Sequence, residues 1–227
     1  MRRSIWLFLL FLLVTSPLYA QLTVNLGGLI GYYNPALNSI HDLLEEARTD
    51  GAYDIQQPGA KLSYGFSFEF MMTPRVFLRF DASRWQTLAS WTINQNGQPN
   101  RSDLSLTLWP VFIGFQLFLN DPEAKFRYYL GAGGGIIRTS LQIESDQAQS
   151  PLFSQSFLES SGSAFASRLH AGFDYALSGP VKLFADVAYL FGSFIPQEID
   201  LLKSRIGKEK ITMDGLDIIA GLKVTLK

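Results

Sequence analysis

The 227-residue chain contains no cysteine, and this absence limits both its chemistry and the ways it can be stabilised. Without thiols there is no disulfide framework, no thiolate metal site and no lipidated N-terminal cysteine. A run of about 18 apolar residues is also missing, so the sequence offers no transmembrane helix. Histidine is scarce, with two residues in the chain, which leaves poor support for a histidine metal site.

Charged residues are few as well, at 17% of the chain, whereas aromatic residues make up 14%. Without Arg2 and Arg3 the chain has 17 basic and 20 acidic residues, a net charge of 17 − 20 = −3. Nucleic-acid binding calls for a basic face, so we expect no nucleic-acid partner. The low charge and many aromatics suit a protein whose outer surface need not contact water.

Residues 1–20 have the composition of a signal peptide. Arg2 and Arg3 form a positive start, Ile5–Val14 is an apolar run of ten residues, and Thr15–Ala20 ends on a small residue suited to cleavage. The alternative is an N-terminal anchor helix, but spanning a bilayer takes about 20 apolar residues. Residues 21–227 are then the mature protein, which we expect to form one domain.

The stretch Arg168–Phe191 shows the pattern that the rest of the chain repeats. Apolar residues recur at every second position from Leu169 to Leu177 and again from Val181 to Phe191, with polar and charged residues between them. Such a period of two puts one set on each face of a strand. The connection Ser178–Pro180 contains Gly and Pro, so the two strands form an antiparallel hairpin.

Eight segments share this alternation and are predicted to be strands. They are residues 22–33, 61–72, 76 to about 85, 103–119, 126 to about 143, 168–177, 181–191 and 214–227. In the fourth segment the apolar set changes phase at Pro110, from Leu104, Leu106 and Leu108 to Val111 and Ile113, which predicts a β-bulge.

Connections alternate between short, around Pro74, Pro122 and Pro180, and long. Short periplasmic turns with long extracellular loops are typical of transmembrane β-barrels. An even strand number lets the last strand pair with the first, and closure leaves no unpaired backbone groups in lipid. We therefore predict an all-β fold, an eight-stranded antiparallel up-and-down transmembrane β-barrel.

This pattern resembles the small outer-membrane β-barrels of the OmpX, OmpA and OmpW type, over essentially all of residues 21–227. In the last strand, Gly221, Val224 and Leu226 resemble the signal that such proteins present to the barrel assembly machinery, although the chain ends on Lys227 where the family usually has an aromatic residue. The resemblance implies the outer membrane of a diderm bacterium, with outer-membrane lipid and the assembly machinery as partners. We expect a monomer.

Ten charged or titratable residues fall on the face expected to point into the barrel. They are Glu69, Arg79, Asp81, Arg168, His170, Asp174, Lys182, Asp186, Asp217 and Lys223. The interior of an eight-stranded barrel is only wide enough for side chains to fill it. These residues therefore form either a self-neutralising polar plug or a path for protons or solutes. The hairpin register makes Asp174 a cross-strand neighbour of Lys182, and His170 one of Asp186.

No catalytic motif accompanies these residues. Barrels of this kind include a lipid A deacylase with a His followed two residues later by Ser, but Gly172 stands at that position after His170. Gly131, Gly133, Gly134 and Gly135 do not make a dinucleotide fingerprint, because Ile136 stands where the third glycine is needed. We expect the inward glycines to make room for large neighbours such as Tyr129 or an arginine. We expect no enzyme activity, no cofactor and no metal.

The long loops carry apolar residues whose use stays open. Asn34 and Pro35 predict the start of a short amphipathic helix with Leu37, Ile40 and Leu44 on one face, and Pro196–Ile206 predicts another. The third loop contributes Leu152, Phe153, Phe157 and Leu158. At the barrel mouth these side chains could accept a small apolar ligand, dock an envelope protein, or pack on one another as a lid.

Three functions follow from these alternatives. The first is a structural, binding or transport protein that passes small apolar solutes through the mouth, as a likeness to OmpW would imply. The second is an adhesin-like or accessory protein of the cell envelope, acting through its extracellular loops. The third is a soluble lipocalin-like barrel, which would turn the apolar face inward.

Overall fold

The structure, a computed structural model, describes residues 23–95, 97–146, 157–195 and 210–226. The predicted signal peptide, the predicted helix at Pro196–Ile206, and Leu152 and Phe153 lie outside the described residues. Phe157 and Leu158 begin a strand, but their side chains also lie outside the described part.

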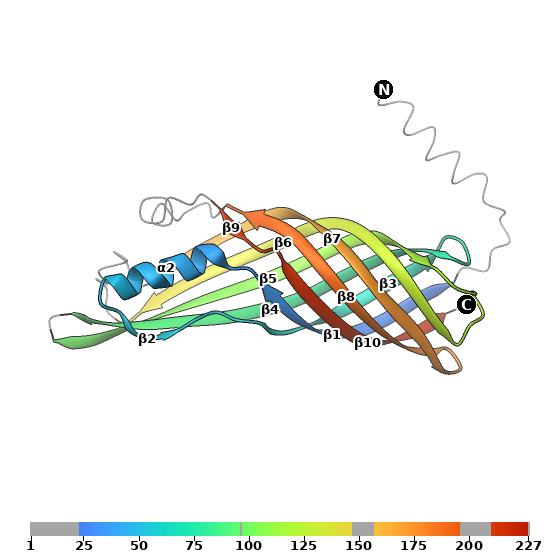
Figure 1. The fold of residues 1–227 in the computed structure, drawn as a ribbon, viewed down its shortest axis with the longest axis horizontal. Helices are drawn as coiled ribbons and strands as arrows, with labels where there is room; N and C mark the ends of the chain where they lie inside the picture. Colours follow the sequence, from blue (N-terminus) through green and yellow to red (C-terminus); the bar gives the residue numbers. More distant parts are fainter. Residues whose placement is uncertain (1–22, 96, 147–156, 196–209, 227) are drawn as a thin grey trace, which may run out of the picture.

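Eight antiparallel strands form a closed wall (Figure 1). They are β1 (Val24–Pro35), β3 (Lys61–Met71), β4 (Val76–Gln95), β5 (Gln98–Phe118), β6 (Phe126–Ser145), β7 (Phe157–Ser178), β8 (Val181–Phe194) and β10 (Gly215–Leu226). Each strand pairs with the next along the chain, and β10 pairs with both β8 and β1. The predicted eight-stranded up-and-down barrel is confirmed.

Three short elements accompany the wall: α2 (Asn38–Thr49), β2 (Tyr53–Gln56) and β9 (Ile211–Thr212). The helix predicted in the first loop is present, but Asn34 and Pro35 do not start it. They continue β1 and pair with Leu216 and Gly215, so the helix begins only after Leu37. No helix in the described part of the chain is long and apolar enough to cross a bilayer.

The barrel has two different ends. We call the end with the connections at residues 72–75, 119–125 and 179–180 the turn end, and the end with α2, β2 and β9 the loop end (Figure 1). Strands β4 to β7 have 20 to 22 residues, whereas β1, β3, β8 and β10 have 11 to 14. Since about 9–11 tilted residues cross a bilayer, the long strands continue past it at the loop end.

The third predicted strand was expected to end near Trp85, but β4 runs on to Gln95. Its continuation pairs with β5 as far as Gln95 and Gln98, and β2 pairs with its other edge at Thr92. The polar residues between Trp85 and Gln95 therefore belong to a strand and not to a loop. The end of this strand was predicted too early because the outer face of β4 beyond Trp85 is mostly polar, as it contacts water instead of lipid.

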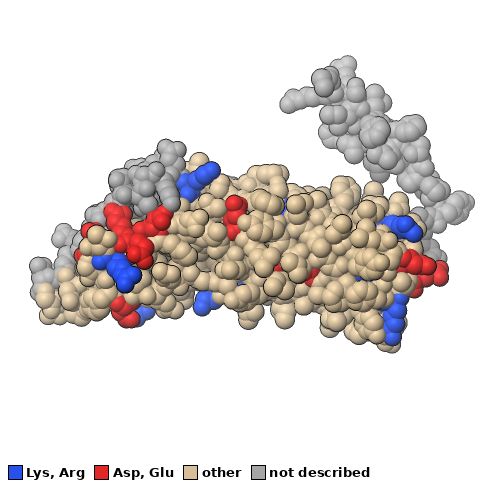
Figure 2. Space-filling model, viewed as in Figure 1, with Lys and Arg blue, Asp and Glu red and all other residues tan. Residues whose placement is uncertain are grey.

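Towards the turn end, the outer face of the wall is apolar. Leu62, Ile30 and Phe66 are among the outward side chains and are 74%, 65% and 63% exposed. Figure 2 shows Lys, Arg, Asp and Glu gathered towards both ends on the face in view, with a largely uncharged band between them. Such a band is the lipid-facing belt of a membrane barrel, and a soluble lipocalin-like barrel would expose polar residues there.

At Pro110 the strand contains no bulge. The pairing of β5 with β6 continues without a shift through Leu108 with Thr139, Pro110 with Ile137 and Phe112 with Gly135. Leu104, Leu106 and Leu108 consequently point into the barrel and are buried, whereas Val111 and Ile113 point outward. The predicted bulge is wrong, because the change of phase marks an exchange of polarity between the two faces.

The same exchange occurs on the neighbouring strands. On β4 the inward side chains change from Arg79 and Asp81 to Trp85 and Ala89, and the outward ones from Phe80 to Arg84. On β6, Ile136 is the last large apolar residue to point outward before the exposed Arg138. The wall is thus apolar outside and polar inside near the turn end, and the reverse near the loop end.

Inside the loop end, α2 packs on the inward side chains of the long strands. We call this cluster the loop-end core; its buried members include Leu37, Ile40, Leu43, Leu44, Ala47, Trp85, Trp91, Leu104, Leu106, Leu108, Leu141 and Ile143. Its side chains are almost fully buried. Burial of one such apolar side chain contributes about 1.5–3 kcal/mol, so the helix is held mainly by its apolar face.

Hydrogen bonds fix the start of α2 to the segment before β10. Ser39 Oγ donates to the carbonyl of Lys210 at 2.9 Å, and the Ala36 amide donates to the carbonyl of Asp214 at 2.6 Å. The Tyr33 hydroxyl donates to the carbonyl of Met213, and its ring meets Trp85 edge-on with 5.5 Å between centroids. These contacts fix the start of the helix beside the segment that leads into β10.

If the loop-end core holds α2, Leu44→Ala will loosen the helix without opening the barrel. Truncating a buried leucine costs about 2–5 kcal/mol, and we expect faster amide exchange along residues 38–49 with an unchanged heat-shift on gels. Leu88→Ala is the matched control, because Leu88 points outward and is 53% exposed. Equal exchange in the two variants would contradict the packing described here.

Candidate functional site

The interior of the barrel between the loop-end core and the turn end holds the residues that the sequence predicted to point inward. Nine of the ten are buried: Glu69, Arg79, Asp81, Arg168, His170, Asp174, Asp186, Asp217 and Lys223. Lys182 is partly exposed near the turn end. The nine come from β3, β4, β7, β8 and β10, so ring closure is what brings them together.

Four of these residues form a closed ring of alternating charge, which we call the arginine–aspartate ring. The Arg79 guanidinium contacts Asp81 through Nε at 2.8 Å and Asp186 through Nη1 at 2.7 Å. Arg168 contacts the same two carboxylates, Asp81 at 2.6 Å and Asp186 at 3.8 Å. Two positive and two negative charges cancel, which is how charge is tolerated away from water.

A second group lies around Lys223, and we call it the lysine cluster. Lys223 Nζ contacts both Glu69 oxygens, at 2.8 and 2.9 Å, and Asp174 Oδ1 at 2.7 Å. Asn25 donates to Glu69 at 2.7 Å and accepts from Thr225 Oγ1 at 2.8 Å. The ammonium group thus has two carboxylate partners from strands on either side of it.

Gln116 links the ring to the lysine cluster. With its amide nitrogen towards Glu69, it donates to Oε1 at 3.0 Å and accepts from Arg79 Nη1 at 3.2 Å. Tyr129 also joins the ring, because its hydroxyl donates to Asp186. The two groups therefore form one connected polar layer across the lumen.

His170 lies beside this layer with no hydrogen bond to its imidazole nitrogens from the described residues. Its ring meets Tyr129 edge-on with 6.0 Å between centroids. A Cβ on Gly131 would overlap the imidazole, and one on Gly172 would overlap Asp186 and Tyr129. Gly131 thus makes room for a large neighbour, as the sequence predicted, and Gly172 has the same role without having been predicted. At Gly133 and Gly135 a Cβ would instead run into the backbone of β5.

The cavity beside the arginine–aspartate ring is small. A cavity of about 10 Å³ is lined by residues of the ring together with His170 and Gly133. That volume is roughly the minimum that admits one water molecule. This cavity therefore admits at most about one water molecule beside the ring, whereas a cavity of about 370 Å³ at the turn end is lined by Arg127, Asp174 and Lys182.

The pairing expected inside the hairpin is only partly present. The register is the expected one, with Asp174 opposite Phe184 and therefore diagonal to Lys182. The ion pair of Asp174 nevertheless goes to Lys223 on β10. Asp217 is buried towards the loop end, and its Oδ1 has no hydrogen-bond partner among the described residues.

Four residues of the layer were missed from the sequence: Asn25, Gln116, Arg127 and Tyr129. Arg127 donates to the carbonyl of Pro74 at 2.9 Å, and its guanidinium lies 3.7 Å from the Phe118 ring centroid. Alternation marks all four as inward, because each is in phase with the inward residues of its own strand. Asn25, Gln116 and Tyr129 are uncharged and so do not stand out as members of a charged interior, whereas Arg127 carries a charge and alternation alone could have identified it.

The apolar residues expected at the mouth divide into two groups. Leu37, Ile40 and Leu44 belong to the loop-end core, where they pack on the long strands. The side chains of Leu152, Phe153, Phe157 and Leu158 lie outside the described residues. In the described parts of the chain, no group of three His, Asp or Glu side chains is placed to hold a metal ion.

The lysine cluster makes a sharp prediction about stability. Lys223→Met leaves Glu69 and Asp174 buried without their shared cation, and removing one partner of a buried ion pair costs about 3–5 kcal/mol. Lys182→Met is the matched control and should cost less than about 1 kcal/mol, because Lys182 is partly exposed. Urea unfolding in lipid vesicles, followed by tryptophan fluorescence, gives both values. Equal losses would show that Lys182 shares the role assigned to Lys223.

No protein-family model and no curated protein matches the chain. Solved structures similar to it are small outer-membrane β-barrels. Neisserial surface protein A is 13% identical, with a TM-score of 0.48 over 89% of this chain and 96% of that one. OprG of Pseudomonas aeruginosa is 13% identical, with a TM-score of 0.46 over 90% and 95%. Outer membrane protein W of E. coli is 15% identical, with a TM-score of 0.41 over 92% and 100%.

Proposed function

We propose that this protein is a non-conducting barrel of the bacterial outer membrane that presents a folded module at the cell surface for interaction with another protein. The module consists of α2, β2 and the parts of β4 to β7 beyond the lipid-facing belt. The belt supports the membrane location, and the signal peptide predicted at residues 1–20 supports export to the outer membrane. The loop end then faces outward.

The observation that carries the proposal is the closure of the lumen at two successive levels. The polar layer fills the part within the belt, where Arg79, Arg168 and Lys223 are buried with their carboxylate partners. The loop-end core fills the part beyond it, where Leu44 and Leu106 have no exposed surface. Filling both levels favours a rigid support over a pore.

The side chains of the module are arranged as in a soluble protein, with apolar residues inside and mostly polar residues outside. On its outer face Arg101 pairs with Asp103 at 3.1 Å, and about half of each side chain is exposed. A structure that extends past the membrane with a water-facing surface suits contact with a partner outside the cell or in the envelope. The adhesin-like or accessory role is therefore favoured over solute passage.

Passage of small apolar solutes remains the competing function, and conduction separates the two. Solute entry at the mouth would have to displace α2 from the loop-end core before reaching the polar layer. We expect planar bilayers containing the purified protein to show no stepwise current, and loaded vesicles to take up apolar probes no faster than empty ones. Faster uptake would overturn the non-conducting barrel in favour of transport.

Contact with a partner is tested by cross-linking on intact cells. A photoreactive residue at Arg101 places the probe on the outer face of the module, and one at Glu123 places it at the turn end. We expect a defined protein adduct from position 101 that disappears when residues 38–56 are replaced by a short linker. Position 123 controls for non-specific capture. Adducts from position 123 alone would place the interaction on the wrong side of the membrane for this proposal.

A further inference from the structure

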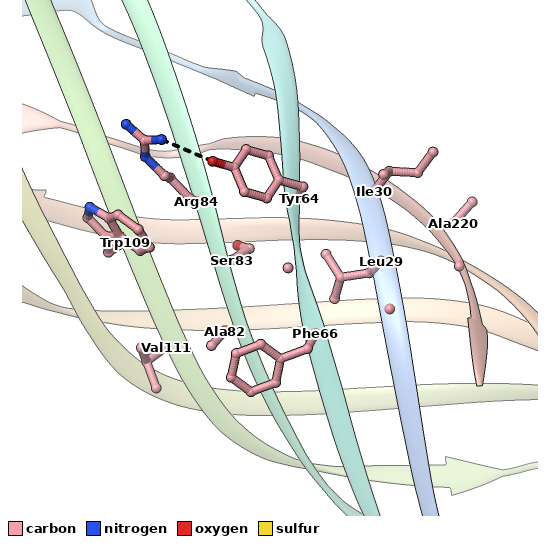
Figure 3. A pocket seen from close by; sticks show the side chains of 13 residues that line it. Leu29, Ile30, Tyr64, Phe66, Ala82, Ser83, Arg84, Trp109, Val111 and Ala220 are labelled. Atoms are coloured by element: carbon pink, nitrogen blue, oxygen red, sulfur yellow. Dashed lines mark hydrogen bonds between the residues drawn. The ribbon is translucent and has the colours of Figure 1, made fainter. Parts of the chain in front are cut away.

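The outer wall has a hollow where β10, β1, β3 and β4 lie side by side (Figure 3). Its volume is about 620 Å³, which lies within the range of roughly 300–1,000 Å³ for small-molecule sites. The floor consists of small outward residues, Gly28, Ala82 and Ala220. Taller side chains surround it: Ile30, Tyr64, Phe66, Trp109 and Val111.

The backbone at Gly28 does not require glycine, so the hollow exists because this position lacks a side chain. A Cβ at Gly28 would meet nothing within 4 Å, so the barrel tolerates a side chain there. Gly65, which also lines the hollow, differs because a Cβ on it would run into the backbone of β4. On the same face of β1, Leu26 and Ile30 on either side of Gly28 are large and exposed.

Arg84 stands over the hollow with uncharged partners. Its guanidinium donates to the Tyr64 hydroxyl at 3.0 Å, beside Trp109 (Figure 3). It also donates to Gln86 Oε1 at 3.1 Å and lies 5.3 Å from the Trp109 ring centroid. Within residues 23–95, 97–146, 157–195 and 210–226 no carboxylate pairs with it, and its buried Nε has no hydrogen-bond partner. The positive charge of Arg84 is therefore uncompensated.

A second arginine that has no carboxylate partner among the described residues lies on the far side of Trp109. Arg138 is opposite Trp109 on β6, points outward and is exposed. Two strand spacings separate the backbones at Arg84 and Arg138, about 10 Å. Both arginines lie where the outer face changes from apolar to polar, which is the depth at which lipid phosphates meet water.

We propose that the hollow is a lipid site for a phosphate-bearing lipid of net negative charge from the leaflet at the loop end. One acyl chain lies over Gly28 between Phe66 and Ile30, and the phosphate contacts Arg84 and Arg138. The acyl chain fills the space that large outward side chains occupy elsewhere on the wall. The phosphate supplies the anion that the described protein residues do not, and guanidinium groups bind phosphate strongly.

The test uses the full protein in phosphatidylcholine vesicles with increasing amounts of phosphatidylglycerol brominated on its acyl chains. Bromine quenches tryptophan on contact, and Trp109 points outward next to the hollow whereas Trp85 and Trp91 are buried inside the wall. We expect the wild type to prefer the brominated anionic lipid by roughly fivefold or more over phosphatidylcholine, as surface arginines attract anionic lipid.

Two sets of variants separate the acyl-chain contact from simple attraction of charge. Gly28→Leu fills the hollow and keeps both arginines, and we expect it to lower the preference at least twofold. Ala220→Leu fills the hollow from β10 as a second variant. The double variant Arg84→Gln with Arg138→Gln should bring the preference close to one.

Controls alter similar residues away from the hollow. Ala132→Leu enlarges an outward residue on β6, and Arg101→Gln removes an exposed arginine that already pairs with Asp103. Both should keep the wild-type preference, and a heat-shift gel checks that each variant is folded. Equal binding of the two lipids by the wild type, or an unchanged preference in both filling variants, would overturn the proposal.

Discussion

Each residue of a β-strand points to one face of the wall, and here the medium outside the wall changes along the strand. Lipid meets the outer face near the turn end, and water meets it near the loop end. Successive side chains alternate between the faces, and here both faces change at the same level, because the inner face that packs on α2 begins where the outer face leaves the lipid. On β5 the change falls between Leu108 and Val111, and on β4 it falls between Asp81 and Trp85.

The polar layer follows from that constraint. Outward apolar residues leave the inward positions as the place for polarity in the membrane, and an eight-stranded barrel is too narrow for bulk water. Charges there must pair with one another, which the arginine–aspartate ring achieves with four residues from β4, β7 and β8. Gly131 and Gly172 complete the arrangement, because the imidazole of His170 and the hydroxyl of Tyr129 occupy the space that side chains there would need.

Much of this could be predicted from the sequence, since alternation identifies each strand and its inward face. The phase change at Pro110 was visible too, but a bulge and an exchange of solvent produce the same pattern in one strand. Only the unbroken register with β6 distinguishes them. The ion-pair partner of Asp174 could not be predicted from the sequence for a different reason. Lys182 is close along the hairpin, whereas Lys223 becomes a neighbour only when β10 closes the ring beside β8.

The two levels of filling also depend on each other. The loop-end core covers the polar layer from the water side, with Trp85 and Phe112 between the arginine–aspartate ring and solvent. The ring is therefore buried partly by the module, and this burial is the reason why its charges need partners. Conversely, the closed wall below holds β4 and β7 at fixed positions, and their continuations then form the inner surface on which α2 packs. A helix of 12 residues would be marginal alone in water, and its place is set by the barrel that it closes.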